Sequence, residues 1–226
     1  MPGCFVTATD TGVGKTVVAA TIAAGLRVQG VRVAASKPVV TGIDEPDPGG
    51  MPADHVLLAA CTGQAPEDVT PVTFRPAVSP HLAADQAGTA LDPEALLAHA
   101  RAVGAAAEVI VVEGVGGLLV PLTRTWSIRD HAVALGLPLV VVARPALGTL
   151  NHTLLTLEAA RGAGLEVRAV VLTPWPAEPS ALEADNLATL RELGGTPVWT
   201  LPRLPVLTPA ALAEASEGWP LRDWTA

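Results

Sequence analysis

Short runs of aliphatic residues recur along this chain, and longer segments in which apolar residues repeat with a helical period separate them. Continuous apolar runs bounded by glycine or proline are typical of strands buried on both faces, so we expect a parallel sheet between two layers of helices. The expected strands are residues 4–7, 31–36, 108–113, 139–143, 167–172 and 198–201.

Helices are expected in most of the segments between these strands, and several begin with a polar capping residue or a proline in the first turn. They are residues 15–29, a helix opened by Asp54, a helix after Ser79-Pro80, residues 93–103, 127–135, a helix that follows the polar turn at 147–152 and ends near residue 163, and residues 180–193. The acidic, Pro- and Gly-rich loop at 43–52 is expected to be flexible, and residues 63–80 are turn-rich without a clear assignment. The alternation of strands and helices predicts one α/β domain over residues 1–226, with a doubly wound, mainly parallel sheet.

A glycine-rich turn containing Gly12, Gly14, Lys15 and Thr16 lies between the first strand and the first helix. In such a turn backbone N–H groups and the helix dipole face a phosphate, the lysine adds a charge, and the threonine hydroxyl can bind Mg2+. The strict motif has glycine where Thr9 stands, so the interpretation rests on Gly14-Lys15-Thr16 and its strand-turn-helix setting. An incidental turn with a lysine is the alternative. The turn predicts nucleotide binding in a P-loop NTPase-like fold, but no particular reaction.

Charged residues also follow two other expected strands. Lys37 comes directly after residues 31–36, and Glu113 ends the strand at 108–113, before a second glycine-rich turn. Residues just past the carboxyl ends of parallel strands line the ligand crevice, so both side chains are expected near Lys15 and Thr16. The alternatives are a solvated lysine and a solvated glutamate. Asp54 could be a helix N-cap and nothing more.

Composition narrows the classes of function. The chain has 226 residues, 50% of them hydrophobic, and a formal net charge of -8, which argues against a nucleic-acid surface. Its longest apolar stretch, residues 135–143, is interrupted by Pro138 and is far shorter than the ~20 residues that span a bilayer. Two cysteines make neither a disulfide framework nor a metal site, and no targeting segment fits the N-terminus, so we expect a cytoplasmic protein.

Several segments together carry a more specific signal. They are FVTATDTGVGKT at 5–16, KPVVTG at 37–42, Asp54, SPH at 79–81, VEGVGG at 112–117 and LGTLNH at 147–152. In this order they resemble the dethiobiotin synthetases, the ATP-dependent ring-closing enzymes of biotin synthesis, and the resemblance covers nearly the whole chain. It implies a homodimer that joins CO2 to 7,8-diaminononanoate, phosphorylates the carbamate with ATP, and closes a cyclic urea through a carbamic-phosphoric anhydride.

The resemblance also implies roles for individual residues. Catalysis would involve Lys37, Lys15 and Thr11, and Mg2+ would be held by Thr16, Asp54 and Glu113. ATP would be bound by Gly12, Val13, Gly14, Lys15, Thr16, Val17, Asp54, Glu113, Gly114, Val115, Gly116, Thr173, Pro202 and Leu204. The substrate would be bound by Thr41 and, from the partner subunit, by Gly148, Leu150 and Asn151, although Asn151 could also be only an N-cap.

The chain departs from the family pattern at three positions. Ala8 stands in place of a loop glycine, where a positive φ would carry a steric cost, and Gly12 stands where many relatives carry glutamate. Thr173 takes the place of an asparagine that reads adenine, and a hydroxyl lacks the paired donor and acceptor of an amide.

The alternative class is a partition or cell-division ATPase that acts as a nucleotide-switched binding protein. Such a protein would carry a lysine at the position of Asp10 and would usually show a basic or amphipathic element for DNA or membrane. Asp10 and the acidic balance of the chain argue against that class.

Overall fold

The computed structural model describes residues 1–45 and 50–226, so part of the loop expected to be flexible at 43–52 lies outside the described residues. The strands are β1 Gly3–Ala8, β2 Val33–Ser36, β3 Val40–Thr41, β4 Thr73–Phe74, β5 Val109–Glu113, β6 Pro121–Thr123, β7 Trp126–Ser127, β8 Leu139–Ala143, β9 Val167–Trp175 and β10 Val198–Pro202. The helices are α1 Lys15–Val28, α2 Asp54–Thr62, α3 Pro66–Val69, α4 Pro80–Ala87, α5 Pro93–Ala105, α6 Ile128–Leu135, α7 Thr149–Gly162, α8 Ala181–Leu193, α9 Pro209–Ala215 and α10 Leu221–Trp224.

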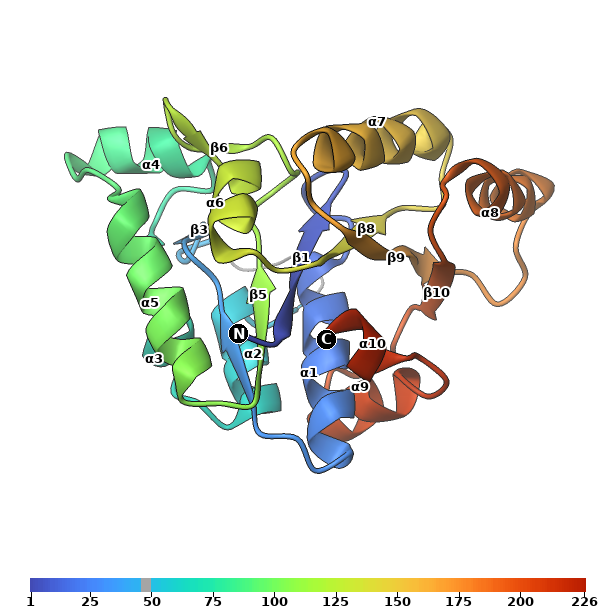
Figure 1. Cartoon of the computed structure of the whole chain (residues 1–226), viewed down its shortest axis with the longest axis horizontal. Helices are drawn as coiled ribbons and strands as arrows, with labels where there is room; N and C mark the ends of the chain where they lie inside the picture. The colour runs from blue at the N-terminus through green and yellow to red at the C-terminus, as the bar shows by residue number, and fades with distance from the viewer. Residues whose placement is uncertain (46–49) are drawn as a thin grey trace.

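Six strands form a central parallel sheet in the order β10-β9-β8-β1-β5-β2. Figure 1 shows β1 between β5 and β8 in the middle of the molecule, with helices around the sheet. The predicted doubly wound α/β fold is confirmed. No helix in the described parts of the chain is both long and apolar enough to cross a membrane.

The apolar strand residues divide between two core clusters, one on each face of the sheet. In β1, Val6 packs into the cluster that contains α1 and α2, and its neighbour Phe5 packs into the cluster that contains α5 and α6. The alternation follows from the period of two along a strand. Because both faces are covered, every residue of β1 is buried, as the continuous apolar pattern predicted.

The buried positions of helix α1 include several small residues beside the larger Val18, Ile22 and Leu26. Ala19, Ala20 and Ala23 are fully buried, and a Cβ at Gly25 would lie 2.2 Å from the Ser216 hydroxyl oxygen, just after α9. Alanine and glycine therefore let α9 and α10 pack directly on α1 at its carboxyl half. The helix starts directly after Gly14, so this packing fixes the phosphate loop to the sheet.

Several elements were not expected from the sequence. Residues 63–80 contain α3 and β4, β6 and β7 form a small antiparallel pair, and β9 continues to Trp175 rather than ending near Leu172. At the C-terminus α9 and α10 bury Trp224, and the carbonyl of Thr225 accepts the N–H of Gly3 at 2.8 Å. Apart from β9 and α9, these elements have only two to four residues, too few to show a period in the sequence.

Candidate active site

A cleft of about 980 Å³ opens where the carboxyl ends of the central strands meet the phosphate loop. Most of the residues predicted for the site line this cleft: Thr11, Gly12, Val13, Gly14, Lys15, Thr16, Val17, Lys37, Thr41, Asp54, Glu113, Val115, Gly116, Thr173, Pro202 and Leu204. They come from segments far apart in the sequence, and the parallel sheet brings them to one edge.

The phosphate loop has the backbone that its glycines predict. Gly12 has φ 70° and Gly14 has φ 97°, in the left-handed region that favours glycine. A Cβ at Gly14 would lie only 2.8 Å from Cγ2 of Thr173, so the absence of a side chain also lets β9 approach the loop. Ala8 is the last residue of β1, and no described residue other than glycine has a positive φ. The steric cost considered for Ala8 therefore does not arise.

Lys37, Asp54 and Glu113 form a charged cluster beside the loop, in which Lys37 and Glu113 are buried and Asp54 is half-buried. The ammonium group of Lys37 donates to Oε1 of Glu113 at 2.7 Å and also to Oδ2 of Asp54. The hydroxyl of Thr16 lies 2.8 Å from both Oδ1 of Asp54 and Oε1 of Glu113. Lys37 is 3% exposed and Glu113 is 0% exposed, so the solvated alternatives for these two residues are wrong.

Asp54 belongs to this cluster and does not cap its helix. The N-cap of α2 is Ala53, and the Asp54 side chain instead bonds Thr16 and Lys37 from the first turn. The N-cap alternative for Asp54 is therefore wrong. Figure 1 places α2 near β5 and α1, and the packing of α2 against α1 brings its first turn to the phosphate loop.

Burial and charge shift the pKa values of the cluster in different directions. Burial lowers the pKa of Lys15 to about 8, although the nearby carboxylates oppose this effect. Burial also acts to lower the pKa of Lys37, but Glu113 and Asp54 outweigh it and raise that pKa. Burial raises the pKa of Glu113 despite Lys37, whereas Lys37 outweighs burial at Asp54 and lowers that pKa. Lys37 therefore keeps its charge, and Lys15 is the lysine whose charge depends on pH near 8.

The donor set fits a hard cation. Two carboxylates and the Thr16 hydroxyl converge, and Oε2 of Glu113 is buried without a hydrogen-bond partner in the described part of the chain. The described residues contain no group of three or more His, Cys, Asp or Glu side chains that could hold a metal. A cation bound here would thus need phosphate oxygens and water to complete its shell, as Mg2+ commonly does.

Four predicted residues lie outside the wall of the cleft. Gly114 is behind it, where a Cβ would lie 3.0 Å from side-chain atoms of Ile128 and Phe5. Gly148, Leu150 and Asn151 lie at the start of α7, away from this cleft. The N-cap of α7 is Gly148, so the N-cap alternative for Asn151 is wrong. Asn151 is exposed in the third position of the helix.

Sequence reasoning missed two arginines near the site. Arg203 lines the cleft directly after β10. Arg144 follows β8 and forms an ion pair with Asp10 of the phosphate loop at 2.7 Å. Both residues come just past the carboxyl end of a strand, which is the rule that singled out Lys37. Applied to every strand, that rule would have found them.

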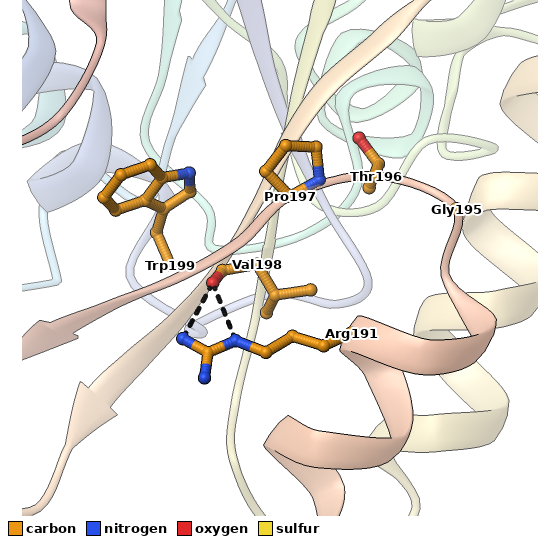
Figure 2. A pocket seen from close by; sticks show the side chains of 6 residues that line it. All are labelled: Arg191, Gly195, Thr196, Pro197, Val198 and Trp199. Atoms are coloured by element: carbon orange, nitrogen blue, oxygen red, sulfur yellow. Dashed lines mark hydrogen bonds between the residues drawn. The ribbon is translucent and has the colours of Figure 1, made fainter.

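A second depression lies between the end of α8 and the start of β10 and has a volume of about 540 Å³. Figure 2 shows its lining, with the Arg191 guanidinium turned toward the backbone carbonyl of Val198 at 3.4 Å. Arg191 is the one titratable side chain in this lining, and its donors face the protein backbone. None of the residues predicted for the site lines this depression, whereas most of them line the larger cleft.

Comparison with known proteins supports the class that the fold indicates. Residues 3–211 match a family described as "AAA domain". A ParA family ATPase from Chlorobium tepidum is similar in structure with a TM-score of 0.54 and 13% identity, over 99% of this chain and 95% of that chain. The MinC:MinD cell division protein complex of Aquifex aeolicus is similar with a TM-score of 0.60 and 12% identity, over 100% of this chain and 94% of that chain. At such identities the likeness concerns the fold alone. Fold and loop together define a P-loop nucleotide-binding protein.

Several relatives with higher sequence identity are named ATP-dependent dethiobiotin synthetase BioD. The protein of Anaeromyxobacter sp. is 45% identical over 76% of this chain and 76% of its own length. Those of Pseudomonas aeruginosa and Bacillus subtilis are 42% and 36% identical, over 94% and 88% of this chain and 95% and 85% of their own lengths. The chain belongs to the dethiobiotin synthetase family, an ATP-dependent ligase family, as its motifs indicated.

Proposed function

We propose that this protein makes dethiobiotin from 7,8-diaminononanoate, CO2 and ATP, in a Mg2+-dependent reaction of biotin biosynthesis. One amine of the substrate adds to CO2 and loses a proton, which gives a carbamate. The carbamate oxygen then attacks the γ-phosphorus of ATP, which gives a carbamic-phosphoric anhydride and ADP. The second amine attacks the carbonyl carbon, closes the cyclic urea and releases phosphate. The observation that carries this proposal is the buried lysine Lys37 beside the phosphate loop in a cleft large enough for nucleotide and substrate.

Two anions have to meet in this reaction, and the cleft supplies positive charge where they would meet. Lys15 and the N–H groups from Gly12 to Thr16 would hold the ATP phosphates, and Lys37 would face the carbamate and the phosphoryl group that it receives. Fixed cations in a buried site act strongly because little solvent screens them. Thr11, at the mouth of the loop, would orient the reacting groups.

Thr16, Asp54 and Glu113 would hold Mg2+, which would neutralise charge on the phosphate oxygens. The Lys37 ammonium now donates to one oxygen of each carboxylate. A cation at Asp54 and Glu113 would compete with it there, and the released Lys37 side chain would be free to turn toward the cleft. This exchange of one positive charge for another would keep a cation beside the buried Glu113 and the half-buried Asp54.

The nucleotide base would lie near Thr173, Pro202 and Leu204, at the far end of the cleft from Lys37. The substrate carboxylate would be held by a second copy of the chain, at the turn that opens α7. Gly148 and Leu150 offer free N–H groups of a helix N-terminus to an anion, and Asn151 adds an amide. We also propose that residues 1–226 act as one domain within a homodimer.

A coupled assay tests the proposal. Protein, diaminononanoate, bicarbonate, Mg2+ and ATP should give dethiobiotin and ADP in equal amounts, and no ADP should form above background without the diamine. If ADP release instead depended on DNA or liposomes and ignored the diamine, the protein would be a nucleotide-switched binding protein.

A further inference from the structure

The phosphate loop of this protein carries a negative charge. Asp10 lies two residues before Gly12, in a loop that must accept a triphosphate. An uncompensated carboxylate so close to the phosphates would oppose nucleotide binding by Coulomb repulsion. The structure shows which groups the Asp10 carboxylate contacts.

Asp10 makes three contacts, and its side chain takes no part in the wall of the cleft. Oδ1 accepts the N–H of Thr11 at 2.7 Å, and Oδ2 accepts a guanidinium N–H of Arg144 at 2.7 Å. The backbone carbonyl of Asp10 accepts the ammonium of Lys15 at 3.1 Å. Both carboxylate oxygens are thus turned to the outer side of the loop, where the carboxylate side chain is 54% exposed.

The register of the sheet brings Arg144 to this place. In the parallel pair of β1 and β8, Ala8 lies opposite Val142, and the N–H of Thr9 donates to the carbonyl of Val142 at 3.0 Å. Asp10 lies two residues after Ala8, and Arg144 lies two residues after Val142. The two residues therefore face each other where the loops leave the adjacent strands β1 and β8, and the strand register fixes their proximity.

We propose that Arg144 is a positioning residue for the nucleotide: it neutralises Asp10 and holds its carboxylate outside the cleft, so that the loop accepts the triphosphate. Exposed ion pairs contribute little to folding, so the value of this pair lies in where it holds the charge. The inference rests on the proposed function only in that the loop binds ATP.

Calorimetric titration with ATP and Mg2+, without diaminononanoate, tests the inference. Arg144→Gln should bind ATP about 10-fold more weakly than the wild-type protein, because the Asp10 charge is then uncompensated. Arg144→Lys should bind ATP nearly as well as wild type. Asp10→Asn combined with Arg144→Gln should restore most of the affinity. In turnover, Arg144→Gln should raise KM for ATP while kcat stays close to wild type.

Arg32→Gln is a matched control, because it removes an exposed arginine paired with Glu108 at 3.2 Å and changes the net charge equally. It should bind ATP like wild type, and all variants should keep the thermal midpoint of wild type. Equal affinity of Arg144→Gln and Arg32→Gln would overturn the inference. A double variant as weak as Arg144→Gln would overturn it too, since Arg144 would then contact the nucleotide itself. Normal ATP binding by a protein that makes no dethiobiotin would contradict the proposed function and leave the role of Arg144 standing.

Discussion

Lys37 and Glu113 form an ion pair of 2.7 Å in the interior of the protein, at the ends of two adjacent parallel strands. Ser36 of β2 lies opposite Val112 of β5, so Lys37 and Glu113 occupy the next step of the same register. The side chain of Lys37 is 4% exposed and that of Glu113 is 0% exposed. Removal of Lys37 would leave the buried Glu113 carboxylate without its paired cation, whereas removal of Glu113 would leave Lys37 paired with Asp54 alone.

Lys37 and Lys15 are predicted to act on different anions. Lys37→Gln should lower kcat by ~10²-fold or more and leave ATP affinity close to wild type, because one transition-state contact of this kind is lost. Lys15→Gln should mainly weaken ATP binding. Steady-state kinetics and calorimetry with ATP separate the two effects, and a thermal midpoint checks that Lys37→Gln is folded. Near-normal turnover of Lys37→Gln, or a loss of ATP affinity as large as that of Lys15→Gln, would show that the division is wrong.

Asp54 and Glu113 are predicted to share one Mg2+. Asp54→Asn and Glu113→Gln should each raise the Mg2+ concentration needed for half-maximal turnover. Because both changes remove ligands of the same ion, the loss of turnover in the double variant, expressed as a free energy, should be smaller than the sum of the losses in the two single variants. Titration of Mg2+ against turnover for the four proteins measures this coupling. Additive losses would mean that only one of the two carboxylates is a ligand.

ATP affinity is predicted to fall as pH rises through 8. Burial lowers the pKa of Lys15 to about 8, and bound phosphates favour its charged form, so ATP binding above this pH takes up a proton. The affinity should fall by up to about tenfold for each pH unit above 8. Calorimetry at pH 8.5 in two buffers of different ionisation enthalpy measures the uptake. Lys15→Arg should show no proton uptake on ATP binding, since a guanidinium does not titrate in this range. An uptake that persists in Lys15→Arg would assign it to another group.

His131 is predicted to destabilise the protein in acid. It is fully buried against the edge of Phe5, and neither ring nitrogen has a hydrogen-bond partner in the described part of the chain. Burial, with a smaller contribution from Arg101, lowers the pKa of His131 to about 4. The unfolded chain therefore binds a proton between about pH 6.5 and 4 that the folded protein does not, and stability falls as pH falls through this window.

The full effect is about 3 kcal/mol in the free energy of unfolding, from a pKa difference of roughly 2.5 units. His131→Leu should remove this dependence of the free energy of unfolding on pH (the slope). Urea unfolding at pH 7 and pH 4.5 gives the difference between the variant and wild type. His152→Gln, at an exposed position of α7, is the matched control and should keep the wild-type slope. The same slope in His131→Leu would assign the acid sensitivity to other groups.

Mixed dimers test the predicted role of Asn151 at a site shared by two subunits. Lys37→Gln and Asn151→Ala subunits should each be nearly inactive as homodimers. Combined in one dimer, they leave one site with a wild-type Lys37 and a partner with wild-type Asn151, so about half the activity should return. Subunit exchange followed by the coupled assay gives the result. A mixture as inactive as its parents would contradict the shared site.

The sequence predicted the six strands of the central sheet and the phosphate loop because those signals are local. It left the state of Lys37 and Glu113 open, because their burial depends on the pairing of β2 with β5, which are 76 residues apart at this pair. The side-chain direction of Asp54 depends in the same way on how α2 packs against α1. The Asp10 and Arg144 pair joins residues 134 apart and was missed. Helices α9 and α10, of seven and four residues, are too short for a periodic pattern.

The central position of β1 affects how the chain folds during synthesis. β1 is synthesised before both of its neighbours in the sheet, which are residues 109–113 and 139–143. At about 5–20 residues per second, the strand that leads into the phosphate loop waits on the order of ten seconds for both partners. During that time an apolar segment with unpaired backbone groups on both edges leaves the ribosome, and long-range pairing of this kind is slow. Pairing of β1 on both of its edges therefore becomes possible only after residue 143 has been synthesised.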